Sequence, residues 1–245
     1  MSTEPAIIIL AAGRGSRLGG NVPKPLTQLT DGRTILQQQL ENIVAAFGES
    51  ALKRTFVVVG YKFEKLIEAL PAGVKPIHNP DWDSSNTSKS VLHALRVLSR
   101  HTGAIWMNGD VVFSPLVLGR AIPFIEQRAS FMAVVEGQTA DEEMKYSLNE
   151  DGTISKVSKE NKRGVGEAVG INYVAPHDML DLMSELRQVE ANAYFEAGIE
   201  RTIQRGLSWH PLPVTGLYAV EIDFAEDLVR ANSVLDEFAH EPSES

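Results

Sequence analysis

A glycine-rich, basic loop is the first stretch of the chain whose residue types could do chemistry. Gly13 and Gly15 have no β-carbon, so an anion could approach their backbone N–H groups closely. Arg14, Arg17 and Lys24 add positive charge to the same loop. An apolar run precedes it, and N–H groups at the end of a strand can converge on phosphate oxygens. We predict a triphosphate cradle, and a glycine-rich turn with solvent-facing cations is the alternative interpretation.

Two common phosphate-binding motifs do not fit this loop. The dinucleotide fingerprint G-x-G-x-x-G needs a third glycine at the position that Leu18 occupies. The P-loop closes with Gly-Lys followed by Ser or Thr, and this loop has no such triplet. Any phosphate cradle here must therefore be of another kind.

Two aspartates far apart in the sequence follow predicted strands. Asp110 comes after the apolar run 104–107, and Asp223 comes after 218–222. Ligands bind beyond the carboxyl ends of strands in parallel sheets. Carboxylates are hard oxygen ligands that suit Mg²⁺. A loop cap is the alternative for either aspartate alone, but as a pair beside the basic loop they predict a Mg²⁺ site.

Alternating strands and helices must position these residues. Short apolar runs predict strands at 6–10, 56–59, 74–78, 104–107, 131–135, 169–174, 209–214 and 218–222. Helical spacing or capping residues predict helices at 35–47, 62–70, 87–98, 179–186, 195–205 and 226–238, with another opening at Pro115 and with Thr34 or Asp31 as the first cap. The segments 144–148 and 153–158 predict a β-hairpin with an acidic turn. The pattern indicates an α/β fold, a mostly parallel twisted sheet flanked by helices with a small β-hairpin insertion.

Composition limits the classes of function. The chain has 245 residues, 43% hydrophobic and 22% charged, which predicts one globular domain over 1–240 and a flexible tail at 241–245. Its net charge of −9 argues against a nucleic-acid partner, and the absence of cysteine excludes disulfides, thiolate zinc sites and a cysteine nucleophile. No apolar stretch approaches the roughly 18 residues that span a bilayer, and the first residues do not resemble a signal peptide. We therefore expect a cytoplasmic protein without a membrane partner.

Three motifs in this order resemble the signature of the nucleotidyltransferase superfamily, whose fold is GT-A-like. They are Leu10-Ala11-Ala12-Gly13-x-Gly15-Ser16-Arg17-Leu18 with Pro23-Lys24-Pro25-Leu26, then Asn108-Gly109-Asp110, then Glu221-Ile222-Asp223 followed by Asp227-Leu228. The resemblance covers nearly the whole chain. It implies transfer of a nucleoside monophosphate from an NTP, with Mg²⁺ as cofactor and pyrophosphate as the leaving group.

The resemblance also implies roles for individual residues. Arg17 and Lys24 are the implied catalytic cations, and Asp110 and Asp223 the implied metal ligands. The implied nucleotide-binding residues are Leu10, Ala11, Ala12, Gly13, Arg14, Gly15, Asn86, Ser90 and Gly109.

A further resemblance points to one group of enzymes within this superfamily. Asn79-Pro80-x-Trp82 followed by Ser85-Asn86-x-x-x-Ser90 is similar to the segment beside the nucleotide base in cytidylyltransferases for phosphocholine, aminoethylphosphonate and inositol phosphate. Helix capping by Ser85 or Asn86 is the alternative interpretation. In the phosphocholine-like members an acidic and aromatic pocket receives the cationic head of the acceptor, where cation–π contacts suit a quaternary ammonium. The residues implied for this pocket are Trp82, Lys145, Lys159, Glu167, Tyr194, Glu196 and Glu221.

We predict an enzyme that transfers CMP from CTP to a small phosphorylated or phosphonylated acceptor, such as phosphocholine or 2-aminoethylphosphonate, with a homodimer as the candidate assembly. A sugar-1-phosphate uridylyl- or thymidylyltransferase is the nearest rival. A glycosyltransferase would share the fold and an aspartate metal site, but Arg17 and Lys24 favour a triphosphate. A catalytically silent nucleotide-binding module would lack a metal ligand, whereas both aspartates are present.

Overall fold

Two β-sheets and the helices around them make up the protein, and the computed structural model describes residues 4–15, 22–99, 101–137 and 143–239. The main sheet contains β1 (Ala6–Ala11), β2 (Thr55–Val59), β3 (Lys75–His78), β4 (Ala104–Asn108), β6 (Phe131–Glu136), β7 (Lys145–Leu148), β8 (Ile154–Ser158), β9 (Gly166–Val174) and β10 (His210–Pro213). The small second sheet contains β5 (Val111–Phe113) and β11 (Ala219–Glu221). The helices are η2 (Lys24–Leu26), α1 (Ile35–Phe47), η3 (Glu49–Arg54), α2 (Phe63–Ala69), α3 (Thr87–Val97), α4 (Leu116–Glu126), α5 (Met179–Gln188), α6 (Phe195–Gln204) and α7 (Ala225–Ala239).

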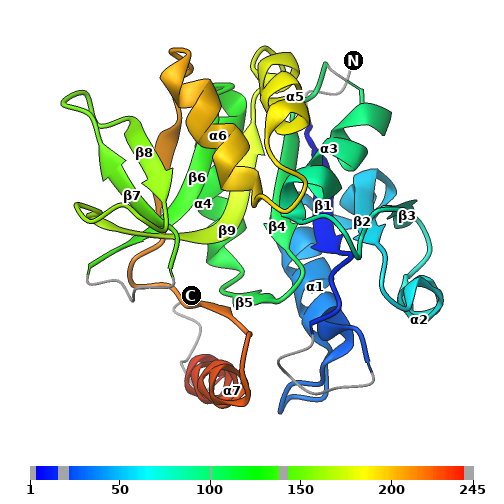
Figure 1. Ribbon diagram of the computed structural model, residues 1–245. Coiled ribbons are helices and arrows are strands. Elements are labelled where there is room, and N and C mark those ends of the chain that lie inside the picture. Colours follow the sequence, from blue (N-terminus) through cyan, green and yellow to red (C-terminus); the bar gives the residue numbers. More distant parts are fainter. Residues whose placement is uncertain (1–3, 16–21, 100, 138–142, 240–245) are drawn as a thin grey trace.

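The main sheet has the order β10-β6-β9-β4-β1-β2-β3. The four strands β3, β2, β1 and β4 run parallel, as does the pair of β10 and β6. β9 runs antiparallel to both β4 and β6, so it joins two parallel blocks. The predicted α/β architecture with a mostly parallel sheet is confirmed. Figure 1 shows the β7–β8 hairpin on the opposite side of the sheet from β3 and α2.

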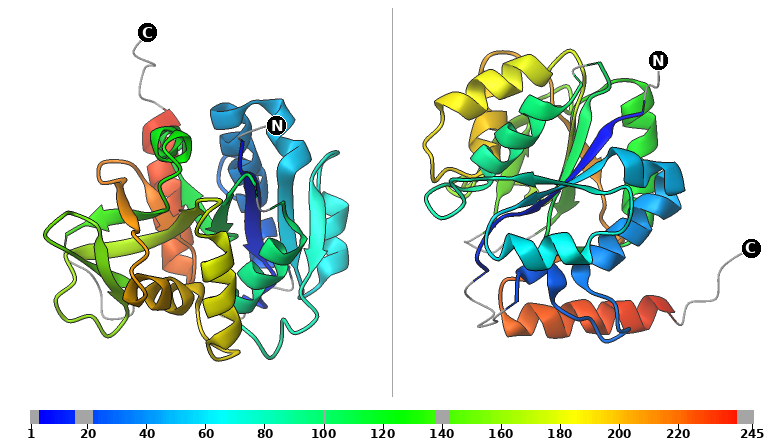
Figure 2. Two further views of the ribbon diagram at one scale, coloured as in Figure 1. Left: turned by 90° about the horizontal axis from the view of Figure 1, so that it is seen from above. Right: turned by 90° about the vertical axis from the view of Figure 1, so that its right-hand side faces the viewer.

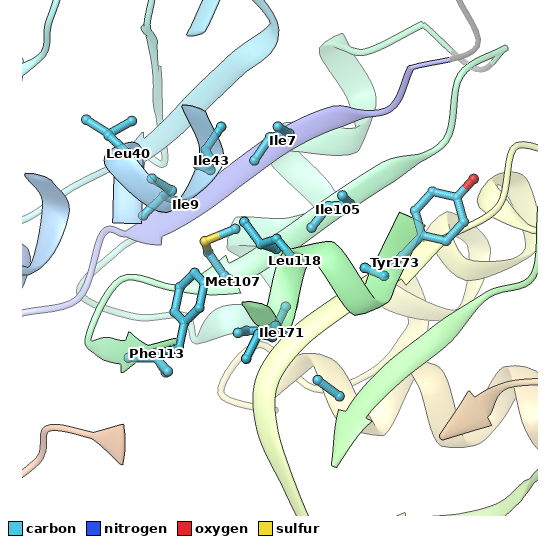
Figure 3. Close-up of a cluster of buried hydrophobic side chains, with 14 of the residues drawn as sticks. Ile7, Ile9, Leu40, Ile43, Ile105, Met107, Phe113, Leu118, Ile171 and Tyr173 are labelled. Carbon is cyan, nitrogen blue, oxygen red and sulfur yellow. The ribbon is translucent and has the colours of Figure 1, made fainter. Parts of the chain in front are cut away.

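Helices cover both faces of this sheet because the side chains of each buried strand alternate between them. Ile7 and Ile9 of β1 face α1 and α4, in a core that also contains Ile105 and Met107 of β4 (Figure 3). Ala6, Ile8 and Leu10, the alternate residues of the same strand, face α3, α5 and α6 in a second core. Figure 2 shows this layered arrangement from two further sides, with α7 lying across one end of the molecule.

The start of α1 follows from a capping box. The Thr34 hydroxyl accepts a hydrogen bond from the Gln37 N–H at 3.2 Å, and the Gln37 side-chain oxygen accepts one from the Thr34 N–H at 2.7 Å. Of the two predicted caps, Thr34 is therefore the one that begins the helix. Asp31 instead accepts hydrogen bonds from Arg33.

Three features of the fold differ from or lie outside the sequence prediction. β5 was not predicted, because three residues are too few to show a period of two. β9 begins at Gly166, three residues before the predicted start, because it pairs there with both β6 and β7. The predicted tail 241–245 lies outside the described residues, and the single domain over 1–240 stays a prediction. No helix among the described residues is long and apolar enough to cross a membrane.

Candidate active site

Three carboxyl groups converge where the two sheets meet. The side-chain oxygens of Asp110, Glu221 and Asp223 lie within 4.8 Å of one another. Asp110 follows β4, Glu221 ends β11, and Asp223 lies two residues further along. The two aspartates predicted to bind metal are thus brought together across more than one hundred residues of sequence, and we call the three residues the carboxylate cluster.

Backbone pairing explains this convergence. β5 begins directly after Asp110 and pairs antiparallel with β11. The Ile222 N–H, between the other two members of the cluster, donates a hydrogen bond to the Asp110 carbonyl at 2.9 Å. The Asp227 carboxylate then accepts the Asp223 N–H at 3.0 Å and so holds the turn that leads into α7. The unpredicted strand β5 is therefore the element that aligns the two motifs predicted to bind metal.

Gly109 brings the cluster close to the glycine loop, by which we mean residues 13–15. Its N–H donates to the Leu10 carbonyl at 2.9 Å, and a β-carbon at this position would lie 2.5 Å from the same oxygen. Only glycine permits this approach without a shift of the backbone. The end of β4 therefore lies against the end of β1, where the glycine loop begins.

Two buried glutamines of α1 donate hydrogen bonds to backbone carbonyls of the segment 108–113, which contains the turn at Asp110. The Gln39 side-chain amide donates to the backbone carbonyls of Asn108 and Val111, both at 2.8 Å. The neighbouring Gln38 amide donates to the Phe113 carbonyl, at the far end of β5, at 2.6 Å. Helix α1 thereby holds the turn that carries Asp110 without touching its carboxylate.

Lys24 places its ammonium group between the two aspartates. The Nζ atom lies 2.8 Å from Asp110 Oδ2 and also bonds to Asp223 Oδ1. Burial by itself lowers the pKa of this ammonium, but the ion pairs with the two carboxylates outweigh it and raise the pKa. Lys24 is therefore the resident cation of the carboxylate cluster.

The cluster fits a divalent cation. Its donors are all carboxylate oxygens, the ligands that Mg²⁺ prefers, and a cation of this chain already occupies the position between Asp110 and Asp223. Enclosure in the pocket, together with the negative charges of both aspartates, raises the pKa of the Glu221 carboxyl although the residue as a whole keeps solvent access. Such mutual repulsion among three carboxyl groups is relieved when a cation binds between them.

A cavity of about 720 Å³ connects the glycine loop, the carboxylate cluster and the start of α6. Most of the residues that the sequence predicted for the site line it. They are Leu10, Ala11, Gly13, Arg14, Gly15, Lys24, Asn86, Gly109, Asp110, Lys159, Glu167, Tyr194, Glu196, Glu221 and Asp223.

One end of the cavity combines a buried acid with an aromatic ring, and we call Lys159, Tyr194 and Glu196 the acid–aromatic recess. Glu196 is 6% exposed, and its Oε2 atom has no hydrogen-bond partner among the described residues. Burial raises the pKa of this carboxyl from 4.5 to about 7, against the opposing effect of the Lys159 charge. The Lys159 ammonium lies 4.9 Å from the centre of the Tyr194 ring. The recess thus has an acid with an unused oxygen and a ring that already holds an ammonium group.

Four of the described residues that were predicted for the site do not line the cavity. Ala12 is buried and does not line the cavity. Ser90 is buried in α3, where it accepts a hydrogen bond from the Asn79 side chain at 3.1 Å, and Trp82 packs against Tyr61 with ring centres 5.5 Å apart. Neither Trp82 nor Ser90 lines the cavity.

Two predicted residues remain: Lys145, which the structure describes, and Arg17, which it does not. Lys145 lies outside the cavity lining, and its ammonium donates to the Lys159 carbonyl at 3.4 Å. Arg17, the second predicted catalytic cation, lies outside the described residues. Asn86, by contrast, lines the cavity and also caps α3 by accepting the Thr87 N–H, so the capping interpretation is confirmed and a role in nucleotide binding stays a prediction.

Sequence reasoning missed Arg230 and Thr87, which also line the cavity. Arg230 belongs to α7 and forms an ion pair with Asp227 at 3.2 Å. Its position three residues after Asp227, within the predicted helix 226–238, places both on one helical face and could have revealed it. No sequence feature marks Thr87 as a cavity-lining residue, apart from its position next to Asn86.

A mixed sheet with helices on both faces defines an α/β fold, and comparison with solved structures finds the same fold. The CTP:phosphocholine cytidylyltransferase LicC of Streptococcus pneumoniae matches with a TM-score of 0.74 and 18% identity, over 95% of this chain and 99% of that chain. The inositol-1-phosphate CTP transferase of T. maritima matches with a TM-score of 0.76 and 19% identity, over 96% and 98% of the two chains. At these identities the likeness establishes a shared fold.

The family itself follows from the sequence match. Residues 7–197 match the model of the MobA-like NTP transferase domain, and the chain belongs to that family. It is a nucleotidyltransferase. A segment of 136 residues, 54% of the chain, is 33% identical to the bifunctional protein GlmU of Gloeobacter violaceus, of which it covers 28%. The matched segment thus spans less than a third of that relative.

Proposed function

We propose that this nucleotidyltransferase moves CMP from CTP to a small acceptor that has a phosphate or phosphonate group at one end and an ammonium group at the other. The observation that carries the proposal is a single cavity lined by the glycine loop, the carboxylate cluster and the acid–aromatic recess. One cavity can therefore hold a triphosphate and a bifunctional acceptor side by side. The choice of CTP is supported by the two solved structures above, each described as acting on CTP.

The reaction is a substitution at phosphorus. A phosphate oxygen of the acceptor attacks the α-phosphorus of CTP and forms a new P–O bond, while the bond from that phosphorus to the bridging oxygen breaks and pyrophosphate leaves. The protein has to bring two anions together and stabilise the negative charge that develops. Bound Mg²⁺ would be held by Asp110 and Asp223 with Glu221 beside them, and it would neutralise phosphate charge and orient the reacting groups.

Residues of the chain supply the rest. The N–H groups of Gly13 and Gly15 would bind the β- and γ-phosphates, since residues without a side chain let phosphate oxygen atoms approach the backbone. The positive φ of 58° at Gly15 is a conformation that favours glycine. Lys24 contacts both the glycine loop and the carboxylate cluster, and this position supports a role in neutralising the α-phosphate. The nucleophile is already an anion near neutral pH, so no general base is assigned.

The ammonium end of the acceptor is inferred from Glu196. A buried carboxylate without a partner is costly, and a ligand cation removes that cost by forming a charge-assisted hydrogen bond or ion pair. The Tyr194 ring adds a surface on which an ammonium group is favourable, as its contact with Lys159 illustrates. Phosphocholine and 2-aminoethylphosphonate have both ends that this arrangement requires.

Pyrophosphate release tests the proposal. The purified protein is incubated with each of the four NTPs and, in turn, phosphocholine, 2-aminoethylphosphonate, inositol phosphate and glucose-1-phosphate, with Mg²⁺ present. We expect release with CTP and an acceptor that carries an ammonium group. Release only with UTP and the sugar phosphate would overturn both the base and the acceptor.

Uridylyl transfer to a sugar-1-phosphate is the second candidate, and the similarity to GlmU favours it. It does not require an ammonium-binding acid. The variant Glu196→Gln distinguishes the candidates, since it raises the KM for an ammonium acceptor and leaves the KM for a neutral sugar phosphate nearly unchanged.

A further inference from the structure

Lys24 has two incompatible positions in the reaction proposed above. In the structure its ammonium bonds to Asp110 and Asp223, and only 11% of its side chain is exposed. In the proposed reaction, a divalent cation lies between those carboxylates, and the lysine ammonium neutralises a phosphate of the nucleotide instead. A dication and an ammonium group a few ångströms apart repel each other strongly in a partly buried site. The two cations therefore exclude one another from the cluster.

The glycine loop contacts the stem of this lysine. A β-carbon at Gly15 would lie 2.9 Å from Lys24 Cγ and 3.2 Å from its Cβ. The absence of a side chain at Gly15 is thus what lets the Lys24 stem pass along the loop into the cluster. The segment proposed to hold the triphosphate and the side chain that fills the cluster are in direct contact.

The second cation of the pocket behaves differently. The Lys159 ammonium lies over the Tyr194 ring, in the recess, and within the described part of the chain it forms no ion pair with the carboxylate cluster. Both lysines line the same cavity, but one is bonded to the proposed metal ligands and the other is not. This contrast separates direct competition from a general effect of positive charge.

We propose that Lys24 is a built-in counter-ion of the carboxylate cluster, which a divalent cation must displace and which the phosphates of the incoming nucleotide then accept. Metal and nucleotide consequently bind cooperatively, and free metal alone binds weakly. The part that concerns the nucleotide rests on the proposed function, whereas the competition between lysine and metal does not.

Mn²⁺ binding without nucleotide tests the competition, measured by the electron paramagnetic resonance signal of free Mn²⁺. Lys24→Met and Lys24→Gln remove the competing charge, so we expect Mn²⁺ to bind about tenfold or more tightly than to the original chain, a ratio equal to about 1.4 kcal/mol. Lys24→Arg retains a cation and should bind Mn²⁺ as weakly as the original chain. Lys159→Met is the matched control, because it removes one positive charge from the same cavity, and it should change the affinity much less.

The change in Tm that Mn²⁺ causes provides a readout that a folding defect cannot imitate. Without metal, Lys24→Met leaves the three carboxyl groups without their cation, so its Tm should fall below that of the original chain. Saturating Mn²⁺ should raise the Tm of this variant more than that of the original chain, since ligand binding to the folded state stabilises it by mass action.

The outcomes separate the inference from the proposed function. Mn²⁺ affinity of Lys24→Met equal to that of Lys159→Met, or weaker than that of the original chain, refutes the competition. Unchanged Mn²⁺ binding in Asp110→Asn refutes the metal site on which both ideas depend. If the charge series behaves as expected but no NTP yields pyrophosphate, the counter-ion role stands and the proposed function fails.

Discussion

Asp110 shows how much chemistry depends on one side chain in this protein. It bonds to the resident cation Lys24, it belongs to the carboxylate cluster, and its backbone carbonyl joins β4 to the residues after β11. Substitution of its side chain leaves the backbone contact in place. The carboxylate can therefore be removed without dismantling the turn that carries it.

Asp110→Ala is expected to lower turnover by about 100-fold or more, since the enzyme loses charge stabilisation of the reacting phosphates. Circular dichroism should show the original fold. Asp83→Asn is a suitable control, because Asp83 is exposed and does not line the cavity. Turnover near that of the control would exclude Asp110 from the reaction.

Glu196 makes stability depend on pH. Its pKa is raised from 4.5 to about 7 in the folded protein, so between these values the folded state holds a proton that the unfolded state has lost. The charges that face it are those of Lys159 and, across the cavity, Glu221. The stabilising contribution is complete below about pH 4.5 and is lost as the pH rises through about 7.

Glu196→Gln should remove this dependence. The free energy of unfolding, measured by urea denaturation at pH 5 and pH 8, should fall with pH by up to roughly 3 kcal/mol more in the original chain than in the variant. Glu68→Gln, an exposed position on α2, serves as the control and should keep the original pH dependence. Parallel pH curves for the original chain and Glu196→Gln would show that the carboxyl does not titrate in this range.

At the residue scale, the sequence predicts which residue types suit the chemistry of a site better than it predicts which partners a given side chain contacts in the fold. Asp110, Asp223 and the glycine loop line the cavity as predicted, and the sequence singles them out because few residue types can hold a dication or let a phosphate reach the backbone. Ser90 was assigned to the nucleotide, yet it bonds to Asn79 inside the protein. A serine in a helix serves either purpose equally well, and only the burial of that helical face decides.

At the scale of elements, α1 has a function beyond covering the sheet. Gln38 and Gln39 replace apolar residues on its buried face, and each donates to a backbone carbonyl of the segment 108–113. The carbonyls near the Asp110 turn receive bonds from Gln39, whereas the one at the end of β5 receives a bond from Gln38. The helix can therefore be tested one contact at a time.

Gln39→Leu should weaken Mn²⁺ binding at the cluster by several-fold and lower stability, because two carbonyls lose their donor at the turn that positions Asp110. Gln38→Leu should cost only about 0.5–1.5 kcal/mol of stability, because the Phe113 carbonyl keeps the Asn42 side-chain amide as a donor at 2.7 Å, and it should leave Mn²⁺ affinity unchanged. Equal Mn²⁺ affinities for the two variants would mean that α1 contributes stability alone.

The sequence indicates long elements more clearly than short ones. The bounds of α1 were predicted as 35–47, and the structure has the same residues, because a 13-residue amphipathic segment has both a cap and a period. β5 has three buried residues directly after the metal motif and neither cap nor period. Its strand character comes from pairing with β11, a contact of high sequence separation that local pattern does not reveal.

At the scale of the whole molecule, the site is assembled from both ends of the chain. The family model covers residues 7–197, which include the glycine loop, Lys24 and Asp110 but neither Glu221 nor Asp223. The segment from β11 through α7 joins the rest through a separate small core, which contains Leu29, Ile35, Val112, Val220, Ile222, Ala231 and Leu235. A metal ion bound in the cluster would therefore connect the family domain to the segment that follows it.

Hydrogen exchange can detect that connection without any catalytic assay. Mn²⁺ should slow amide exchange both in the segment 108–113 and in the segment 219–227, because one bound ion restrains carboxylates from both. The β7–β8 hairpin contributes no carboxylate to the cluster, so its exchange should stay unchanged and provides an internal control. In Asp223→Asn the slowing should diminish in 219–227 and persist more strongly in 108–113. Slowing confined to one segment in the original chain would contradict a shared site and would mean that the two halves of the cluster act separately.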